Sequence, residues 1–380
     1  MSEQNKDKIQ VLRVQNFTCF EDVSFEFSTG INLFIGENGT GKTHILKLLY
    51  AMLTNDFASF HDHYEDKLEK IFKTTISELL RNKLINGDGR GSFLIKKSGE
   101  NFKFQFGHLG PEELGGFPSN FLDFSTNTND LKSVDYSPDD WSPANYPPTE
   151  LKDLNAASLF IPCAEMLSLY PGFISAYNKR ENSFDDTHYD LALALNANPL
   201  KNSSLKLAEE LSNIIEKALN IKVIMENDKF YIVFKNDNNR KVAAPLAAEG
   251  IKKLGQMIYL IRNGSLTKET ILFWDEPEVN LNPKYIRLVA DFLMTLARQG
   301  IQIFVATHDY LLTHYLSSHA EYQEVTNAPP MKFFSFYKTE NGTAIETANT
   351  IAGIQNNVLL DEYSALYDLE GSFFNQSIKM

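Results

Sequence analysis

The sequence predicts an α/β fold with a mixed central sheet, an antiparallel β lobe near the N-terminus, and helical and loop insertions. The first observation is a run at 31–35 that is apolar except for Asn32, which leads through a glycine-rich loop into an apolar pattern at helical spacing over 45–53. The second is a pair of apolar runs, 271–276 and 301–307, each ending in polar residues and followed by a helical pattern. Continuous apolar strands that alternate with helices are typical of a parallel sheet covered on both faces.

Residues 1–106 are expected to form the N-terminal part of the fold, including the antiparallel lobe. Short runs rich in β-branched and aromatic residues predict its strands, and the sequence SGEN between two of them predicts a hairpin turn. The expected elements are strands at 9–14, 23–27, 92–97 and 102–106, and a helix at 62–84.

Residues 107–157 are expected to form an acidic loop insertion, because their proline content excludes a helix or a central strand. Prolines stand at positions 111, 118, 138, 143, 147 and 148. A loop of this length is uncommon in a compact domain, and a role in contacting a partner would explain it.

The rest of the chain is expected to return to the core at 158–240, and residues 241–380 complete it. The expected elements are a strand at 158–163, helices within 166–220 and a hairpin of 221–226 and 229–234. After the strand at 271–276 come a helix from about 284, the strand at 301–307 and a helix from about 309. A hairpin of 331–338 and 343–347 and a helix around 357–367 end the chain.

The charge of the chain limits its nucleic-acid-binding surfaces. The 380 residues carry a formal net charge of −13, so the chain as a whole is not such a surface. Residues 67–103 nevertheless hold nine basic against four acidic residues, and residues 107–154 hold nine acidic against two basic ones. These segments are either two solvated faces, or a basic groove for nucleic acid beside an acidic loop for a partner.

Targeting signals and cysteine usage indicate the compartment. The polar N-terminus has no signal-peptide pattern, and no stretch reaches the about 18 apolar residues that a membrane span needs. The two cysteines, Cys19 and Cys163, lie far apart without a His or Cys cluster, which fits a reducing compartment better than a disulfide framework or a zinc site. We therefore expect a cytoplasmic protein without membrane association.

The segment GENGTGKT at 36–43 matches the phosphate-binding loop pattern in full. Glycines let the backbone turn so that consecutive N–H groups point at phosphate oxygens, and the following helix adds its N-terminal dipole. Lys42 is expected to reach the β- and γ-phosphates, and the Thr43 hydroxyl to bind Mg²⁺. The loop therefore predicts a P-loop NTPase that binds ATP with Mg²⁺. The residues expected at the nucleotide are Gly36, Asn38, Gly39, Thr40, Gly41, Lys42, Thr43 and His44, although helix packing would also explain His44.

Acidic and imidazole side chains end two of the predicted strands. The strand at 271–276 ends in Asp275 and Glu276, at the carboxyl edge where parallel sheets bind ligands. Asp275 is suited to hold Mg²⁺, and Glu276, pointing the other way on the strand, to activate the attacking water as a general base. His308 follows the strand at 301–307, where it would contact the γ-phosphate or hold that water. The sequence thus predicts Glu276 and His308 as catalytic residues.

The order of these motifs resembles the ABC-type ATPases, and most closely the soluble SMC/RecF branch. The resemblance implies an ABC-ATPase head, with Walker A in the glycine loop, Walker B at Asp275 and Glu276, and a switch histidine at His308. Some stretches are also similar to compact prokaryotic ATPases of anti-phage defence, among them PARIS-type ATPase subunits and OLD-family heads. The stretches that carry the resemblance are 12–27, 36–43, 160–173, 246–256 and 272–283.

The stretch LAAEG at 246–250 stands where ABC heads keep the signature motif, which caps the γ-phosphate held by the partner. The usual serine is absent, so Glu249 and Gly250 are expected to offer backbone N–H groups at a helix start. Lys252 and Lys253 are candidates to add positive charge, and an ordinary packed helix would explain the same pattern. The resemblance also implies a dimer-contacting loop at 278–283 and a Q-loop position at Glu165.

These features predict an ABC-type ATPase that forms a homo-oligomer around Mg-ATP, as a sandwich dimer or a larger assembly. The resemblance implies control of a separate effector protein, a nuclease or toxin, in anti-phage defence. Two alternatives stay open. One is a RecF-like DNA-repair or DNA-sensing ATPase that binds nucleic acid through residues 67–103, and the other is a nucleotide-gated scaffold with little hydrolysis.

Overall fold

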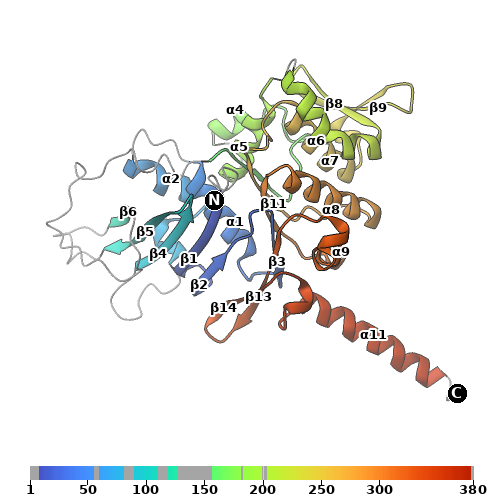
Figure 1. Cartoon of the computed structure of the whole chain (residues 1–380). Helices are drawn as coiled ribbons and strands as arrows, with labels where there is room; N and C mark the ends of the chain where they lie inside the picture. Colours follow the sequence, from blue (N-terminus) through green and yellow to red (C-terminus); the bar gives the residue numbers. More distant parts are fainter. Residues whose placement is uncertain are drawn as a thin grey trace.

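The fold consists of a central sheet, an N-terminal β lobe on one side of it and a helical lobe on the other (Figure 1). The computed structural model describes residues 8–54, 60–80, 90–109, 119–126, 156–180, 183–198, 200 and 203–377. Over these residues the strands form three sheets, of six, five and three strands. This arrangement confirms the predicted α/β class.

The central sheet is mixed, as predicted. Its strand order is β14-β13-β3-β12-β11-β7. The neighbours from β13 to β7 run parallel, and β14 is antiparallel to β13. The strands are β3 (Ile31–Gly36), β7 (Ser158–Ile161), β11 (Ile271–Asp275), β12 (Gln302–Ala306), β13 (Met331–Thr339) and β14 (Gly342–Ala348).

Both faces of the central sheet are buried, which explains why its strands are apolar along most of their length. Successive side chains of a strand point to opposite faces, so Leu33 and Ile35 join one hydrophobic cluster and Phe34 the other. The first cluster includes α7 (Glu249–Arg262) and α8 (Pro283–Arg298). The second includes α1 (Lys42–Leu53) and the strands of the N-terminal lobe. The helix α1, which follows the glycine loop, is therefore packed between the central sheet and the sheet of the N-terminal lobe.

The N-terminal lobe is an antiparallel sheet of order β2-β1-β4-β5-β6. Its strand β6 corrects the expectation of a loop over 107–157, since residues 119–126 pair with β5. No proline occurs between positions 118 and 138, so a strand fits there although the segment as a whole is rich in proline. Residues 110–118 and 127–155 lie outside the described part. The strands are β1 (Ile9–Phe17), β2 (Phe20–Glu26), β4 (Arg90–Lys97), β5 (Glu100–Leu109) and β6 (Ser119–Thr126).

The helical lobe carries a small sheet of order β10-β9-β8. The hairpin β8–β9 turns at Asn227 and Asp228, both with positive φ, which is the geometry that such two-residue turns require. The strand β10 was not predicted, because four residues give a weak pattern. The elements are α4 (Phe173–Asn178), α5 (Asp186–Leu195), α6 (Ser203–Leu219), β8 (Ile221–Glu226), β9 (Lys229–Phe234) and β10 (Arg240–Ala243).

The helix expected over 62–84 is broken in the structure. The helix α2 (Phe60–Phe72) ends before Lys73, whose φ is 56°, and a new helix, α3 (Ile76–Leu79), starts after the capping residue Thr75. Polar capping at Thr75 interrupts a hydrophobic period that continues across both helices. Residues 81–84 lie outside the described part.

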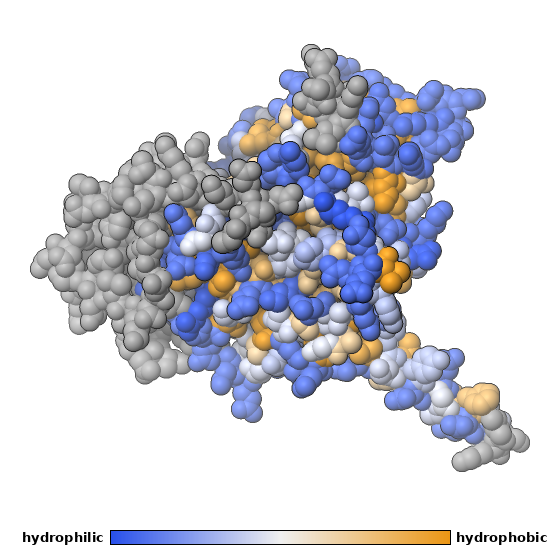
Figure 2. Space-filling view, in the orientation of Figure 1, coloured by the Kyte–Doolittle hydropathy of each residue, from blue (hydrophilic) through white to orange (hydrophobic). Residues whose placement is uncertain are grey.

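The C-terminal segment contains α9 (Tyr310–Glu321), α10 (Gln323–Thr326) and α11 (Val358–Ser377). The last helix is longer than the predicted one and projects away from the body of the molecule (Figure 1). Its first turns contact the rest of the fold, since the Tyr363 ring stacks on Tyr310. Figure 2 shows hydrophilic and apolar residues mixed over the coloured part of the visible face, and apolar side chains exposed on this helix include Phe373 and Phe374. None of the described helices is apolar and long enough to cross a membrane.

Candidate functional site

The glycine loop joins β3 to α1 through backbone angles that favour glycine. Gly36, Gly39 and Gly41 have φ values of 137°, 76° and 89°, a region that other residues rarely adopt. A Cβ atom at Gly41 would lie 2.5 Å from the Cys19 Sγ atom, so the space also demands glycine. The Thr40 hydroxyl donates to the carbonyl oxygen of Glu37 at 2.8 Å and fixes the turn.

Lys42 lies inside this loop. Its Nζ atom donates to the carbonyl oxygens of Gly36 at 2.9 Å and Glu37 at 2.7 Å. Burial lowers the pKa of Lys42 to about 8, although Glu276 and Asp275 favour its charged form. The lysine is therefore held close to the loop amides by carbonyl groups, and a phosphate there would provide a stronger acceptor.

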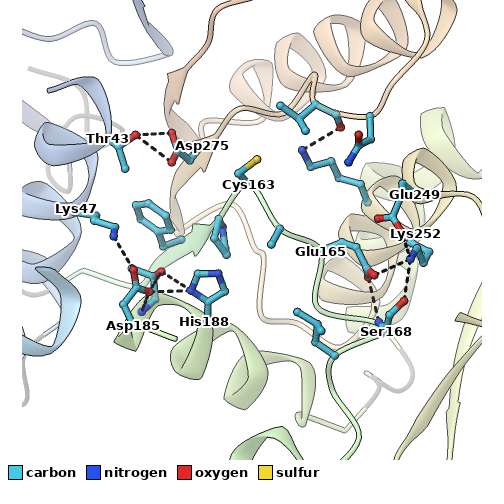
Figure 3. A pocket seen from close by; sticks show the side chains of 18 residues that line it. Thr43, Lys47, Cys163, Glu165, Ser168, Asp185, His188, Glu249, Lys252 and Asp275 are labelled. Atoms are coloured by element: carbon cyan, nitrogen blue, oxygen red, sulfur yellow. Dashed lines mark hydrogen bonds and ion pairs between the residues drawn. The ribbon is translucent and has the colours of Figure 1, made fainter. Parts of the chain in front are cut away.

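Thr43 and Asp275 meet although 232 positions separate them in the chain. The Thr43 hydroxyl lies 3.0 and 3.1 Å from the two carboxylate oxygens of Asp275, which ends β11 (Figure 3). Burial raises the pKa of Asp275 to about 6. A hydroxyl and a carboxylate are oxygen ligands that suit Mg²⁺, which takes its other ligands from phosphate and water. A cation would also neutralise a carboxylate whose charge burial disfavours, so these two residues fit a Mg²⁺ site.

Glu276 and His308 form a second pair beside the loop. The Glu276 Oε1 atom lies 3.3 Å from His308 Nε2, and Glu276 Oε2 accepts a hydrogen bond from the Cys163 thiol at 3.3 Å. Burial lowers the pKa of His308, so the ring is neutral near pH 7. The structure corrects the expected position of Glu276: β11 stops at Asp275, and Glu276 has a φ of 48°. A left-handed residue, and not strand alternation, turns its side chain towards His308.

Glu278 contributes to this pair in a way that the sequence did not indicate. Its Oε1 atom accepts the backbone N–H of His308 at 2.9 Å, and its Oε2 atom is buried without a hydrogen-bond partner. Burial raises the pKa of Glu278. The sequence reading assigned Glu278 only to the dimer-contacting loop, because the His308 backbone lies on another strand end.

The signature-like stretch begins a helix at the expected place. Ala248 caps α7 and Glu249 is its first residue. Gly250 is buried, and a Cβ atom there would lie 2.7 Å from a methyl carbon of Leu281 and 3.2 Å from the Asn280 carbonyl oxygen. The helix start therefore packs directly on the loop that follows Glu278.

Neither lysine of α7 faces outward, which corrects the expectation that they add charge towards a partner. Lys252 is 3% exposed and pairs with Glu165 at 2.9 Å and with Glu249 (Figure 3). Lys253 is 4% exposed and donates to the Glu276 carbonyl oxygen at 2.6 Å. The carboxylate of Glu165, the candidate Q-loop residue, is thus engaged by Lys252 in this conformation.

His44 lies at the start of α1, but its ring packs edge-on against Phe72 with the ring centroids 5.6 Å apart. Its Nδ1 atom is buried without a hydrogen-bond partner. The side chain therefore serves packing, as the helix interpretation of His44 expects.

A pocket of about 670 Å³ connects the Thr43–Asp275 pair with the start of α7. Figure 3 shows Thr43 and Asp275 on one side of this pocket and Glu165, Lys252 and Glu249 on the other. Its third wall holds residues that the sequence reading missed. There Asp185 accepts from Lys47 at 2.6 Å and contacts the His188 ring at 2.9 Å.

Asp185 links the glycine-loop helix to α5. Its side chain also accepts the backbone N–H of Thr187 at 3.1 Å and so caps α5. Burial alone would raise the pKa of Asp185, but the bonds from His188 and Lys47 hold it well below its usual value. The Asp-Asp-Thr-His pattern at 185–188 is the sequence feature that could have indicated these pocket residues. The same pattern is typical of an ordinary helix cap, so by itself it did not predict them.

The segment 67–103 does not present its lysines as one basic face. Lys97 and Lys103 are 2% and 1% exposed, and Lys67 pairs with Asp190 at 2.5 Å and Asp186 at 3.3 Å. These contacts weaken the expectation of a basic groove for nucleic acid. The basic residues at 81 and 83 lie outside the described part.

Solved structures of SMC heads resemble this chain. One is the Smc head domain with an extended coiled coil bound to the C-terminal domain of ScpA, from Pyrococcus furiosus. It has a TM-score of 0.51 at 13% identity, covering 95% of this chain and 99% of that one. A second, an SmcHead bound to the C-winged helix domain of ScpA, has a TM-score of 0.51 at 12% identity, covering 90% and 98%. At these identities the likeness shows the fold alone.

Curated relatives match over a short segment. The DNA replication and repair protein RecF of Lactococcus lactis is 34% identical over 56 residues, which cover 14% of this chain and 16% of that protein. RecF of Cytophaga hutchinsonii is 42% identical over 55 residues, covering 14% and 15%. The matched segment is thus only a small part of either relative's length.

A family model covers much more of the chain. The model described as "AAA domain, putative AbiEii toxin, Type IV TA system" matches residues 31–313, a span that contains the glycine loop, β11 and His308. This match extends over well over half of the 380 residues. The chain therefore belongs to this family, and it has the P-loop NTPase fold that the SMC heads share.

Proposed function

We propose that this protein binds Mg-ATP at the glycine loop and hydrolyses it. The observation that carries the proposal is the convergence of three strand ends. The loop after β3, Asp275 and Glu276 after β11, and His308 after β12 come together at one edge of the central sheet. This is the edge at which parallel sheets bind ligands.

Each group has a distinct role in the proposed reaction. The loop amides and Lys42 hold the phosphates, and Thr43 and Asp275 hold Mg²⁺, which supplies positive charge at the phosphate oxygens. Glu276 accepts a proton from the attacking water, and His308, whose Nε2 atom lies 3.3 Å from Glu276 Oε1, orients this carboxylate. Since His308 is neutral near pH 7, it does not neutralise the proposed base.

Turnover measurements on two variants test the hydrolysis. Lys42→Ala is expected to lose ATP binding, because the loop loses its cation. Glu276→Gln is expected to bind ATP as wild type does and to lower kcat by about 10²–10⁴-fold, the usual contribution of a general base. Steady-state phosphate release and equilibrium nucleotide binding measure the two effects. Wild-type turnover no faster than that of Lys42→Ala would exclude the enzymatic proposal.

We further propose that two chains associate around the nucleotide. The start of α7, with Ala248 and Glu249 exposed, offers a helix N-terminus to the γ-phosphate bound by the other chain. The support is the position of this helix start beside the pocket that contains Thr43 and Asp275. Backbone N–H groups would make the contact, since Lys252 and Lys253 are engaged within their own chain.

The biological role that we propose is control of a separate effector, a nuclease or toxin, in prokaryotic anti-phage defence. The family description, which mentions a toxin system, supports it, as do the SMC heads solved with ScpA bound. ATP-dependent association would then switch the effector on or off. Association that proceeds with ATP but without measurable turnover would favour a nucleotide-gated scaffold instead.

A RecF-like role in DNA sensing is the second candidate, and the RecF relatives favour it. The burial of Lys97 and Lys103 argues against the groove through which such binding was expected. A DNA affinity that falls steeply with salt, and falls again when the charge of Lys96 is reversed, would support this role.

A further inference from the structure

Lys253 occupies an unusual position for a lysine. It lies in the second turn of α7, is 4% exposed, and points beneath the turn that follows β11. Its Nζ atom donates to the carbonyl oxygen of Glu276 at 2.6 Å and lies 3.4 Å from that of Val279. A buried ammonium group requires such acceptors, because its desolvation is otherwise costly.

The turn that Lys253 contacts has a strained backbone. Glu276 has a φ of 48°, which is disfavoured for a residue with a side chain, and Asn280 has a φ of 65°. Such residues persist only where the surroundings hold them in place. The Glu276 N–H donates to the carbonyl oxygen of Ala306 at 2.9 Å, and the Glu276 carbonyl oxygen accepts from Lys253.

This backbone geometry sets the position of the Glu276 carboxylate. The same residue whose carbonyl Lys253 holds directs its Oε1 atom to His308 and its Oε2 atom to Cys163, each at 3.3 Å. A rotation of the turn would move the carboxylate away from His308. Lys253 itself donates to main-chain oxygens, so it fixes the backbone that carries this carboxylate.

The helix α7 meets this segment at a second point. Gly250 approaches this segment closely, since a Cβ atom there would lie 2.7 Å from a methyl carbon of Leu281 and 3.2 Å from the Asn280 carbonyl oxygen. The first two turns of α7 therefore contact both ends of the segment 276–281, at Glu276 through Lys253 and at Leu281 through Gly250. A displacement at the start of α7 would be transmitted to Glu276 in the same chain.

We propose that Lys253 is a positioning residue for Glu276, and that it couples the helix start facing a partner's nucleotide to the hydrolytic carboxylate of its own chain. This inference rests on the proposed function. It goes beyond it by assigning a role to a residue whose ammonium group binds the main chain next to the hydrolytic carboxylate.

The experiment compares Lys253→Met with Lys8→Met in the full chain. Lys8 is a matched control, because it is also buried at 7% exposure and also donates to a main-chain oxygen, that of Gly300 after α8. Both substitutions remove a buried ammonium group and keep most of the side-chain volume. Lys253→Gln, which retains a hydrogen-bond donor, serves if Lys253→Met fails to fold.

The first readout is amide hydrogen exchange over residues 276–281, which does not depend on activity. Lys253→Met is expected to speed exchange in this segment by about tenfold or more, since it removes a hydrogen bond to a charged group. Lys8→Met is expected to leave exchange there unchanged. Equal exchange in wild type and Lys253→Met would overturn the proposal, whatever the turnover of the protein.

The second readout is a double-mutant cycle with Glu276→Gln. Lys253→Met alone is expected to lower kcat by about tenfold or more while the equilibrium affinity for ATP stays within about twofold. In the Glu276→Gln background the same change is expected to have no further effect, because the group that it positions is gone. If Lys253→Met lowers kcat by the same factor in the wild-type and the Glu276→Gln backgrounds, Lys253 does not act through Glu276. Absence of wild-type turnover would refute the proposed hydrolysis. The exchange measurement would still show whether Lys253 holds residues 276–281 in place.

Discussion

Asp275 shows at the residue scale how burial and function compete. Its carboxylate accepts from Thr43, but burial still raises its pKa to about 6 from a reference value of 3.8. Between these values the unfolded chain has lost the proton while the folded chain keeps it. The contribution of Asp275 to stability is therefore complete below about pH 4 and declines until the pH passes about 6.

We predict that Asp275→Asn stabilises the protein in the absence of nucleotide and metal. The amide keeps a partner for Thr43 without a buried charge, so the free energy of unfolding at pH 7 should rise by about 1–3 kcal/mol. The gain should fall to about half of that at pH 5, because Asp275 of the folded wild-type protein is already largely protonated there. Denaturant unfolding at the two pH values measures both quantities.

Addition of Mg²⁺ and ATP is the control for this prediction. Wild type should then become more stable, because Mg²⁺ compensates the charge of Asp275, and Asp275→Asn should gain much less. A variant that is less stable than wild type at pH 7 without ligands would contradict the assignment of a destabilising buried carboxylate.

The residue scale also shows the limit of sequence reading at this site. The glycines, Lys42, Thr43, Asp275 and His308 could be predicted, because a local pattern requires each residue type. The turn at Glu276 could not be predicted, since a strand continued through it would have satisfied the same sequence. The packing of His44 on Phe72 depends on where α2 lies, which no local pattern records.

At the element scale, the connection from β3 to α1 depends on two glycines for different reasons. Gly36 pairs with Phe336 of β13, and a Cβ atom there would lie 2.1 Å from the Phe336 carbonyl oxygen. Gly39 has open space around it and needs glycine only for its φ of 76°. The first glycine is required by sheet pairing, and the second by the shape of the loop.

We predict that Gly36→Ala lowers the free energy of unfolding by about 3 kcal/mol or more, since the strands β3 and β13 must separate. Gly39→Ala should cost only about 1–2 kcal/mol, the cost of a left-handed conformation. Denaturant unfolding of both variants measures this difference, and each serves as the control for the other. Equal losses in the free energy of unfolding would show that β13 can move away from residue 36 at little cost.

Element boundaries show where the sequence pattern was insufficient. The high proline content of residues 107–157 as a whole predicted a loop and so concealed β6. A strand needs only a short stretch without proline, which this segment contains. The helical period across α2 and α3 concealed the break at Lys73 and Thr75, since both helices bury residues of the same cluster. Local backbone preferences decided these cases.

At the scale of the whole molecule, association around ATP depends on the start of α7. Ala248 is the capping residue and is exposed, so a substitution there changes the surface without disturbing the core. Gly250 is a poorer choice for such a test, because a side chain there would require Leu281 of the same chain to shift.

We predict that Ala248→Asp and Ala248→Ser both stabilise the isolated chain by about 1 kcal/mol, because both supply a helix cap. Only the aspartate should weaken association with Mg-ATP, since its charge would oppose a γ-phosphate held by the other chain. Light scattering of both variants in the Glu276→Gln background, with and without Mg-ATP, measures the association. Equal association of the two variants would show that the nucleotide does not contact this helix start.

The sequence by itself determined the class of the fold, the glycine loop and the residue types at the strand ends. These features follow from side-chain periodicity and from torsion angles that only glycine adopts readily, and both are local properties. The tertiary structure decided which of these groups meet. Because the sheet order β3-β12-β11 differs from the chain order, only the folded chain brings Thr43 to Asp275 and Glu276 to His308. It also turned Lys252 and Lys253 inward, because a buried lysine needs acceptors that distant segments supply.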